Sequence, residues 1–594
     1  MLNLLKSNFV FLETNRFDRD NQTSYFFSDP LRVISCYKLE DVKEALFEIE
    51  GWLSKGFYAA GFISYEAGVS FEESLKDLKL DPLFPLLWFG IYKKPRIFSH
   101  REKVDTLPNK RSSYAINNLK PNISRKKYVD NIKRIKGFIR RGDTYQVNYT
   151  FKYKFDFSGS ISGFYEDLKT RQSVSYSSLI KTPGFSILSL SPELFFRKNQ
   201  EQMEVRPMKG TIDRGRSAEE DKRNVEALRQ SVKNRSENVM IVDLLRNDLG
   251  RISKAGTVKT MKLFEVERYE TLLQMISIVQ SKLKKNVSIY DLFKAIFPSG
   301  SVTGAPKIST MKIINSLEKE PRRIYTGSVG FFAPDGNAVF NVAIRTALLD
   351  NKTKKGEIGI GSGIVIDSDA GKEFDECRLK ADFITKKKTD FKLIETILWQ
   401  PKKGYFLLDS HIKRLLESSE YFNFKFNKKI MLKELKDLEK KFRNGHDYRI
   451  RALLGKDGKI ESSFSRIDKA ARALKARFSD KKTSSEDTFL YHKTTNRGLY
   501  NKEHERWNEK GYFDIIFTNE KNQITEGAIS NIIIKKANTY YTPPVECGLL
   551  NGVFRKSLFR KISLKEKVLY KKDVLAADEV YMANSVRGMV RVKL

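Results

Sequence analysis

A short polar and basic stretch at residues 385–390, Thr-Lys-Lys-Lys-Thr-Asp, separates two parts of the sequence that have different patterns. Polar and charged runs of this kind between periodic segments are typical of linkers. The chain has 594 residues, which is enough for several compact domains with their own cores. The stretch therefore predicts two domains, residues 1–384 and 391–594, joined by a linker.

Both parts have the mixed pattern of an α/β or α+β fold. In the first part, strand-like segments punctuated by Gly and Pro alternate with amphipathic stretches such as Ala218–Leu249, and the last clear helix covers Lys372–Ile384. The second part predicts another series: a strand at Leu393–Trp399, a helix at His411–Tyr421, a strand-turn-strand series at Asp514–Lys536 and a helix at Gly548–Lys561.

Composition argues against several classes of protein. The 109 Lys and Arg residues exceed the 73 Asp and Glu residues by 36, which raises the possibility of a nucleic-acid partner. However, the basic residues are scattered among acidic ones and no DNA-binding or RNA-binding motif is present, so we expect no nucleic-acid partner.

No apolar run approaches the ~20 residues of a membrane span, so we expect a cytoplasmic protein without a membrane partner. Three separated cysteines, Cys36, Cys377 and Cys547, predict neither a disulfide framework nor a zinc site.

Two charged side chains in the first part are candidates for acid–base and nucleophilic chemistry. Glu193 follows an apolar strand in Ser-Pro-Glu-Leu-Phe-Phe, and Lys209 lies between a proline and a glycine in Arg-Pro-Met-Lys-Gly-Thr. If both faced one cavity, they would supply a general acid or base and an amine nucleophile. Taken alone, such residues more often form a surface turn and a solvated lysine.

Three glutamates are candidates for holding a divalent cation. Glu373 and Glu376 lie one turn apart on a predicted helix, and Glu237 lies near the start of the helix predicted at residues 236–250. Carboxylate oxygens are the ligands that hydrated Mg²⁺ prefers. The alternative is an exposed face on which Glu376 pairs with Lys380 at i,i+4, and spacing alone favours that alternative.

Glycine-rich segments and one arginine are candidates for binding an anion. We expect loops at Pro298–Lys307 and Gly359–Gly363, where backbone N–H groups can approach a negatively charged group closely. In the predicted strand Phe340–Leu349, Arg345 alternates with the core residues and projects to the opposite face, where it can hold a carboxylate or reach water.

Considered together and in order, the motifs of residues 190–384 resemble those of the chorismate-utilising enzymes. They are Ser-Pro-Glu, Pro-x-x-Gly-Thr, Glu-Asn-x-Met-Ile-Val-Asp-Leu-x-Arg-Asn-Asp, Gly-Ser-Val-Thr-Gly-Ala-Pro-Lys, Gly-x-Gly-Ser-Gly and Glu-x-Asp-Glu. Ser-Tyr-Glu-Ala-Gly at residues 64–68 and Gly-Asp-Thr-Tyr-Gln-Val-Asn at residues 142–148 resemble the N-terminal half of the same family. The resemblance implies a large fold of antiparallel sheets with helices.

Within that family, the residue at position 209 separates the members. Anthranilate and isochorismate synthases usually carry alanine there, whereas aminodeoxychorismate synthases carry lysine, so the resemblance implies amination of chorismate at C4. Lys209 would add to the ring and expel the C4 hydroxyl, and Glu193 would serve as general acid and then as base for ammonia.

The same resemblance implies the remaining residues of the first site. Glu237, Glu373 and Glu376 would hold Mg²⁺, which neutralises the ring carboxylate of chorismate. One departure is Gln274, which occupies a position where anthranilate synthases have histidine, and glutamine cannot shuttle a proton at neutral pH. The residues that match chorismate-binding positions are Gly210, Thr211, Thr303, Tyr325, Arg345, Gly361, Gly363 and Lys380.

In the second part, Lys493 and Glu526 are the minimum for a pyridoxal phosphate site. A lysine can form a Schiff base with the cofactor's aldehyde, and a carboxylate can keep the pyridine nitrogen protonated. Thr-Glu-Gly-x-x-Ser-Asn at residues 525–531, together with the segments at 409–415 and 548–555, resembles the fold-type IV pyridoxal-phosphate enzymes.

This second resemblance implies that Arg414 binds the cofactor phosphate and that four residues add backbone donors, namely Ser530, Asn531, Gly552 and Val553. The part begins near Leu393 and so lacks the opening strands of stand-alone members, which leaves cofactor occupancy and dimer packing open.

The two resemblances together imply synthesis of 4-aminobenzoate: the first domain would make aminodeoxychorismate, and the second would eliminate pyruvate from it. No cysteine lies in a Gly-x-Cys-x-Gly turn, so we expect ammonia from solution or from a separate glutamine amidotransferase subunit. Three alternatives stay open: anthranilate synthase component I with a pyridoxal-phosphate appendage, a synthase joined to an aminotransferase, and a basic nucleic-acid-binding protein.

Overall fold

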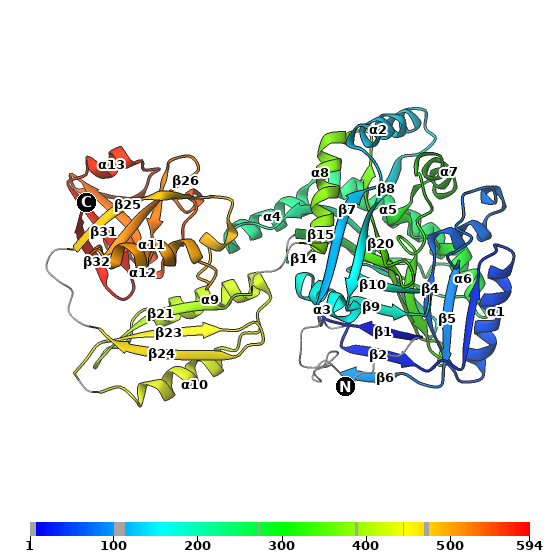
Figure 1. Cartoon of the computed structure of the whole chain (residues 1–594), viewed down its shortest axis with the longest axis horizontal. Helices are drawn as coiled ribbons and strands as arrows, with labels where there is room; N and C mark the ends of the chain where they lie inside the picture. Colours follow the sequence, from blue (N-terminus) through cyan, green and yellow to red (C-terminus); the bar gives the residue numbers. More distant parts are fainter. Residues whose placement is uncertain are drawn as a thin grey trace. The chain divides into compact units, whose positions relative to one another are not determined.

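The structure is a computed structural model that describes residues 8–18, 20–99, 113–270, 272–385, 390–443, 445–467 and 474–594. It divides into two compact units, shown together in Figure 1. The first comprises residues 1–212 and 226–388, and the second comprises residues 213–225 and 389–594. Most of the predicted linker, residues 386–389, lies outside the described residues.

The first unit is built on two large antiparallel sheets. The strand order of sheet one is β16 (Gly304–Ala305), β8 (Gln146–Gly159), β20 (Lys355–Ile364), β19 (Thr346–Asp350), β10 (Phe185–Ser191), β9 (Tyr176–Lys181), β1 (Phe9–Glu13), β2 (Thr23–Ser28) and β6 (Arg96–Ser99), with β7 (Tyr114–Pro121) paired to β8. The order of sheet two is β13 (Met208–Asp213), β15 (Leu272–Lys282), β12 (Gln202–Val205), β11 (Leu194–Asn199), β18 (Ala338–Val342), β17 (Ser328–Phe332), β4 (Tyr58–Ile63), β5 (Leu87–Tyr92) and β3 (Arg32–Cys36), with β14 (Lys259–Arg268) paired to β15.

The two sheets pack face to face, and helices cover their outer faces. Strand β1 shows why: its side chains alternate, so Val10 joins a cluster with Phe62 of sheet two, whereas Phe9 and Phe11 join a cluster with Tyr128 of helix α2. Because both faces are buried, such strands are apolar throughout. The helices are α1 (Asp41–Ser54), α5 (Val232–Ile252) and α6 (Ile289–Ile296) on sheet two, and α2 (Arg125–Arg140), α3 (Ile161–Arg171), α7 (Lys307–Leu317) and α8 (Ala370–Ala381) on sheet one.

The second unit contains a small sheet and a larger one. The small sheet has the order β22 (Gly404–Tyr405), β21 (Leu393–Gln400), β23 (Tyr448–Leu454) and β24 (Ile460–Arg466), with α9 (Leu408–Phe422) and α10 (Lys428–Glu439) packed on it. The larger sheet has the order β27 (Ile524–Gly527), β26 (Asp514–Asn519), β25 (Leu474–Thr483), β32 (Gly588–Lys593), β31 (Glu579–Asn584), β28 (Asn531–Lys536), β29 (Thr539–Thr542) and β30 (Leu564–Glu566). Its helices are α11 (Gly498–Asn508), α12 (Val553–Leu558) and α13 (Lys571–Leu575).

The predicted fold class, mixed α and β with antiparallel sheets, is confirmed, but three predicted elements are wrong in detail. The amphipathic stretch 218–249 is two helices, α4 (Ala218–Gln230) and α5, because the side chain of Ser231 caps the second by accepting a hydrogen bond from the Asn234 backbone N–H. Helix α5 also continues past Gly250 to Ile252. The helix predicted at 548–561 is shorter: within that range only α12 (Val553–Leu558) is helical. A 3₁₀ turn at Val545–Cys547 precedes the range.

Two further corrections concern the candidate site. Gly359–Gly363 is part of strand β20 and not a loop, and glycine is required at 359 because a Cβ there would lie 2.1 Å from the ring of Tyr325. The strand predicted at 340–349 is broken between β18 and β19, which belong to different sheets. The chain crosses between sheets at Arg345, whose φ of 50° is in the left-handed region.

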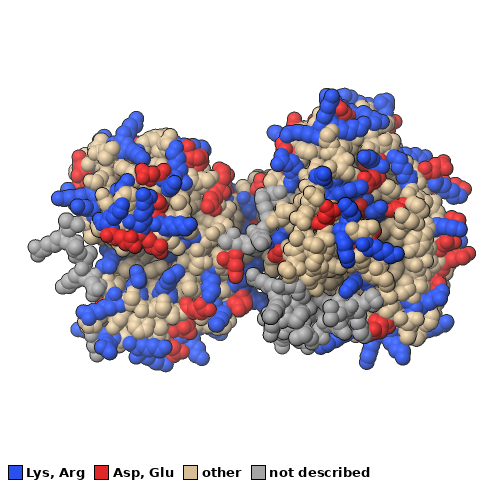
Figure 2. Space-filling model, viewed as in Figure 1, with Lys and Arg blue, Asp and Glu red and all other residues tan. Residues whose placement is uncertain are grey.

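On the face shown in Figure 2, Lys and Arg side chains are interspersed with Asp and Glu, as the sequence pattern indicated. Among the described residues, none of the helices is long and apolar enough to span a bilayer.

We predict that Phe196→Ala destabilises the first unit strongly. Phe196 is fully buried on β11 and stacks on Phe340, with ring centroids 5.0 Å apart. Removing the ring leaves a cavity that should cost about 3–5 kcal/mol in the free energy of unfolding, measured by denaturant titration. The control Leu83→Ala, at a side chain that is 88% exposed, should change it by less than about 0.5 kcal/mol. Equal effects of the two substitutions would contradict the assignment of Phe196 to the core.

Candidate functional site

Glu193 lies buried in the turn between β10 and β11, at the end of the apolar strand as predicted. Ser301 donates its hydroxyl to Glu193 Oε1 at 2.6 Å. Burial raises the pKa of Glu193 to about 7, although Ser301 and Lys209 oppose the rise. The carboxyl group can therefore hold or release a proton near neutral pH.

Lys209 lies on β13 of sheet two, opposite Gly363 on β20 of sheet one. A Cβ at Gly363 would lie only 2.6 Å from Lys209 Nζ, so the amine occupies the space that the missing side chain leaves. Within the described part of the chain, Lys209 Nζ makes no hydrogen bond. Burial lowers the pKa of Lys209, which favours the neutral, nucleophilic amine.

Gln146 is a site residue that the sequence reasoning did not single out. Its Nε2 lies 3.1 Å from the position that a Cβ at Gly363 would occupy, so Gln146 and Lys209 face the same space. We call this space, bounded by Lys209, Gln146 and Gly363, the chamber. The side chain is fully buried, yet neither its Nε2 nor its Oε1 has a hydrogen-bond partner among the described residues. Buried amides are normally paired, so this group is available to a ligand. The available signal was its place in the Gly-Asp-Thr-Tyr-Gln-Val-Asn motif.

Further predicted residues surround or support this chamber. Lys380 Nζ donates to the carbonyl oxygen of Gly361 at 3.1 Å, and Lys380 is among the charges that affect the pKa of Lys209. Thr211 Oγ1 donates to Gln274 Oε1 at 3.0 Å, and Gln274 Nε2 donates to the Gly210 carbonyl at 2.9 Å. The glutamine that replaces histidine thus holds strand β13 in register.

Three predicted substrate-binding residues have different surroundings. Thr303 is fully buried and gives its hydroxyl to the Ser299 carbonyl at 2.7 Å. Tyr325 packs against Gly359 of β20. The side chain of Arg345 makes no hydrogen bond or ion pair within the described residues, and its ionisable neighbours are Tyr269 and Glu270. Its guanidinium is therefore available to an anion, but no contact brings it to Lys209.

The three predicted magnesium ligands are neighbours but are not arranged as a metal site. Burial raises the pKa of Glu237, and the negative charges of Glu373 and Glu376 raise it further, so the three carboxylates lie close enough to repel one another. Glu376 pairs with Lys380 at 2.7 Å, which is the alternative that spacing favoured, and Glu373 accepts from Ser368 at 2.9 Å. Among the described residues no three potential ligands converge. The donor oxygens suit Mg²⁺, and the magnesium assignment stays a prediction.

In the second unit, Lys493 is half-buried, and its amine has no hydrogen-bond partner in the described chain. Burial lowers its pKa to about 7, with further lowering by the positive charges of Arg497 and Arg414. The backbone N–H of Ile394 donates to the Lys493 carbonyl at 2.8 Å, which fixes this residue against β21. At pH 7 about half of the Lys493 amines are therefore neutral, and the neutral form is the one that reacts with an aldehyde.

Glu526 and the segment around Gly552 form the other side of this site. Burial raises the pKa of Glu526 to about 8. Asn531 Nδ2 lies 3.3 Å from Glu526 Oε2 and donates to the Leu550 carbonyl at 2.9 Å. A Cβ at Gly552 would lie 2.1 Å from Asn531 Oδ1, so the absence of a side chain at Gly552 lets these segments meet.

The other predicted cofactor residues lie on the same elements. Ser530 precedes β28 and Val553 is the first residue of α12. Arg414 donates from Nε and Nη2 to Glu395 at 2.9 and 2.7 Å, which leaves Nη1 without a partner in the described residues. Burial would raise the pKa of Glu395, but Arg414 and His411 hold it at about 2, so this carboxylate stays ionised and orients the arginine.

Arg497 is a second residue that the sequence reasoning missed. Its Nη2 donates to the Ala528 carbonyl, which ties the segment after Lys493 to the segment that carries Glu526. These unpaired and perturbed groups fit pyridoxal phosphate: an amine for the aldehyde, a carboxyl group for the ring nitrogen and a guanidinium nitrogen for the phosphate.

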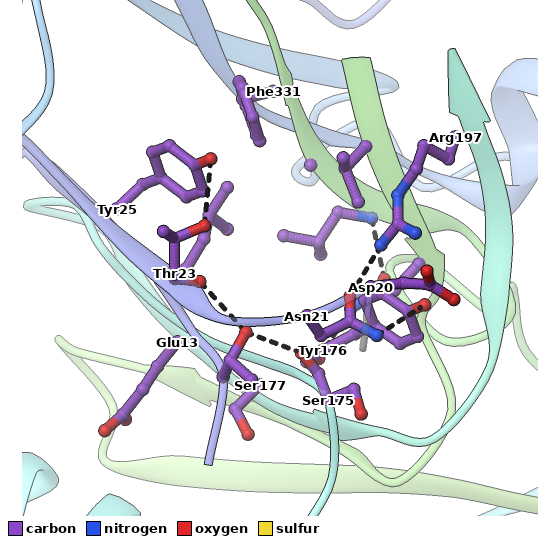
Figure 3. A pocket seen from close by; sticks show the side chains of 16 residues that line it. Glu13, Asp20, Asn21, Thr23, Tyr25, Ser175, Tyr176, Ser177, Arg197 and Phe331 are labelled. Atoms are coloured by element: carbon purple, nitrogen blue, oxygen red, sulfur yellow. Dashed lines mark hydrogen bonds between the residues drawn. The ribbon is translucent and has the colours of Figure 1, made fainter. Parts of the chain in front are cut away.

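A cavity of about 170 Å³ lies elsewhere in the first unit (Figure 3). Polar side chains including Asn21, Ser177 and Arg197 line it, and Arg197 Nη2 donates to Asn21 Oδ1 at 2.6 Å. None of the predicted catalytic, metal-binding or substrate-binding residues lines this cavity.

Comparison with known families finds two family models that match this chain. The model of chorismate binding enzymes matches residues 14–386, and the model of amino-transferase class IV matches residues 392–594. The chain therefore belongs to the family of chorismate binding enzymes, and it carries a class IV aminotransferase-like domain after that region. Both resemblances seen in the sequence are confirmed at this level.

Individual relatives include both synthase types. Anthranilate synthase component 1 1 from Haloarcula marismortui is 36% identical over 253 residues, which cover 43% of this chain and 51% of that protein. Aminodeoxychorismate synthase component 1 from Escherichia coli K12 is 32% identical over 348 residues, covering 55% of this chain and 76% of that protein. The chain thus spans about half the length of some relatives and about three quarters of others.

A solved structure shows the same fold for the first unit. Anthranilate synthase component I from Streptococcus pneumoniae TIGR4 superposes with a TM-score of 0.54 at 24% identity, covering 63% of this chain and 94% of that one.

We predict that Lys493 reacts with an amine-selective label with a midpoint near pH 7. Burial lowers the pKa of its amine to about 7, whereas an ordinary lysine titrates at about 10.4 and stays charged until the pH is far higher. Arg497→Met should raise the midpoint because it removes a positive charge beside the amine, and Arg560→Met, at an exposed arginine, should not. Labelling is followed at this residue by peptide mass spectrometry, and a midpoint at the ordinary lysine value would contradict the prediction.

Proposed function

We propose that the chain makes 4-aminobenzoate from chorismate and ammonia in two steps, as an aminodeoxychorismate synthase component I joined to an aminodeoxychorismate lyase. The observation that carries the first step is the amine of the half-buried Lys209, which has no hydrogen-bond partner in the described chain and fills the space above Gly363. An amine held out of water, with Glu193 among the charges that affect its pKa, is suited to covalent catalysis.

In the first reaction, Lys209 adds to the chorismate ring at C2 as the C4 hydroxyl departs. Glu193, with a pKa of about 7, protonates that hydroxyl and then accepts a proton from the attacking ammonia. Ammonia bonds at C4 and Lys209 is released, so the enzyme returns to its starting state. Lys209 must be neutral to react, and its lowered pKa makes that form accessible.

Charged groups around the chamber would position the substrate. Mg²⁺ held by Glu237, Glu373 and Glu376 would neutralise the ring carboxylate of chorismate. Lys380, which lies near Lys209, and Arg345, which no contact links to Lys209, would supply positive charge, and the backbone of Gly361 and Gly363 would permit close approach. Hydroxyl and backbone groups of Gly210, Thr211, Thr303 and Tyr325 complete the proposed set. Ammonia would come from solution or from a separate glutamine amidotransferase subunit.

In the second reaction, Lys493 removes the C4 proton of aminodeoxychorismate, and pyruvate leaves as the ring becomes aromatic. Pyridoxal phosphate, when bound, supplies the electron sink for this step. Glu526 would hydrogen-bond the pyridine nitrogen and hold a proton there; burial raises its own pKa to about 8, so the carboxyl carries a proton at neutral pH before the cofactor binds. Arg414 Nη1 would take the phosphate, together with Ser530, Asn531, Gly552 and Val553.

A second candidate function is anthranilate synthesis by the first unit, which the anthranilate synthase relatives favour. It requires elimination of pyruvate in the first site, and Gln274 supplies no proton shuttle for it. The two candidates differ in product. Incubation of the purified chain with chorismate, an ammonium salt and Mg²⁺, with and without pyridoxal phosphate, followed by chromatography, separates 4-aminobenzoate from anthranilate.

Two substitutions should each stop one of the two proposed reactions and leave the other intact. Lys209→Ala should stop amination while pyridoxal phosphate still binds, because it removes only the first amine. Lys493→Ala should abolish the visible absorbance of the bound cofactor and let aminodeoxychorismate accumulate. Chromatography and absorbance spectra report both results. Full amination by Lys209→Ala would show that this lysine is not the nucleophile.

Gly363→Ala should lower the amination rate by about 100-fold, the order of loss expected when a reacting group is displaced by about 1 Å. Its Cβ would lie 2.6 Å from Lys209 Nζ and 3.1 Å from Gln146 Nε2, so both must move. Gly250→Ala is the control: apart from its chain neighbours and the backbone of its own helix, no atom lies within 4 Å of the added Cβ, and alanine in helix α5 should stabilise the protein by about 0.5–1 kcal/mol. Steady-state kinetics and thermal unfolding measure the two effects. Normal turnover by Gly363→Ala would contradict the proposal that Lys209 reacts from the space beside Gly363.

A further inference from the structure

A short segment from the middle of the sequence belongs to the second unit. Residues 213–225 begin at the last residue of strand β13 and include the first half of helix α4, and they group with residues 389–594. Lys209 precedes Arg214 by five residues. The chain therefore enters the second unit directly after the strand that carries the proposed nucleophile, and it leaves again within helix α4.

Arg214 anchors this segment through a buried ion pair. Its Nε and Nη2 donate to the two carboxylate oxygens of Asp221 at 2.6 and 3.1 Å, and these side chains are only 4% and 6% exposed. The Asp221 carboxylate also accepts from the Gly215 backbone N–H at 3.2 Å. Since a buried ion pair adds little net stability compared with an apolar contact, its value here is a defined geometry for the guanidinium.

The guanidinium of Arg214 then holds Tyr421 at the end of helix α9. It lies 4.2 Å from the centroid of the Tyr421 ring, and Nη2 donates to the Tyr421 carbonyl at 3.2 Å. In return, the Tyr421 hydroxyl donates to the Gly215 carbonyl at 2.6 Å. Three directional contacts thus fix one aromatic ring against the segment.

Tyr421 in turn packs on the residue that precedes Lys493. The rings of Tyr421 and His492 lie 4.4 Å apart, and His492 Nδ1 lies 3.0 Å from Ser418 Oγ. Burial lowers the pKa of His492 to about 3, so this ring stays neutral and acts by packing rather than by titration. Because His492 and Lys493 are consecutive residues, the packing of His492 fixes the backbone position of Lys493.

Arg216 makes a parallel contact with the same region. Its Nη1 donates to the Ser485 carbonyl at 3.1 Å, and its guanidinium lies 5.4 Å from the ring centroid of Tyr491. Two arginines of the segment therefore contact both the end of helix α9 and the stretch that leads to Lys493.

We infer that Arg214 is a positioning residue of the second site, which holds Tyr421 and His492 in the packing that shields the Lys493 amine from water. The inference rests on the proposed pyridoxal-phosphate function only for its consequence in cofactor binding. The charged groups that face Lys493 are Arg497, Arg414, Glu395 and Glu526, and Arg214 is not among them. Its action is therefore through packing and exclusion of water, not through direct charge.

The test uses the full chain with two variants and one control. Arg214→Lys keeps the charge but loses the two-point contact with Asp221, and Tyr421→Phe removes only the hydroxyl that bonds Gly215. Arg223→Lys is the control, because Arg223 is exposed on helix α4, which also carries Asp221, and its side chain makes no hydrogen bond or ion pair in the described chain. Thermal unfolding reports whether each variant is folded.

Two readouts are taken: the pH midpoint of Lys493 labelling without cofactor, and the affinity for pyridoxal phosphate from visible absorbance. Both test variants should raise the labelling midpoint by about one pH unit, because water entering the site weakens the desolvation that lowers this pKa. They should weaken cofactor binding about 10-fold, which corresponds to about 1.4 kcal/mol. Arg223→Lys should change neither.

The outcomes separate this inference from the proposed function. An unchanged labelling midpoint in folded Arg214→Lys and Tyr421→Phe would overturn the inference, even if their melting temperatures fell. If Arg214→Lys does not fold, Tyr421→Phe decides. If the unaltered chain binds no pyridoxal phosphate, the proposed second activity fails, while the labelling midpoint, measured without cofactor, still decides the role of Arg214.

Discussion

Removing a lysine amine from water is costly because the ammonium ion loses its hydration, and both candidate sites depend on that cost. Burial is the largest cause of the lowered pKa at Lys209 and at Lys493. Each amine lacks a hydrogen-bond partner in the described chain, so no hydrogen bond occupies the nitrogen lone pair that would attack a carbon atom. Each also has a buried carboxyl group with a raised pKa in its electrostatic environment, Glu193 in one site and Glu526 in the other.

The two-sheet architecture of the first unit supplies this burial for Lys209. The lysine comes from β13 of sheet two, and the glycine that leaves room for it, Gly363, comes from β20 of sheet one. The chain returns from one sheet to the other at Arg345, in a left-handed conformation. A chamber between elements of two sheets can hold groups that are distant in sequence, and small residues at the contact decide how close they come.

In the second unit, the segment 213–225 shows that a compact unit need not be a continuous stretch of sequence. The polar stretch at residues 385–390 predicts one boundary between two parts, and the two family models match residues 14–386 and 392–594. The packing adds a second connection, in which the buried pair of Arg214 and Asp221 is completed by Tyr421. An ion pair seven residues apart looks like an ordinary local contact in the sequence, so only its tertiary partner reveals where it belongs.

The ordered motifs were enough to predict the fold class, the family resemblances and the two lysines, because residue types at fixed spacing report local chemistry. They did not predict that Gly359–Gly363 is a strand, that the strand at 340–349 is broken, or that Gln146 shares the chamber of Lys209. Nor did they decide between a magnesium ligand and an ion pair for Glu376, which in the structure contacts Lys380. These features arise from contacts between residues far apart in the chain, and periodicity and composition carry no record of which surfaces meet when two sheets pack together.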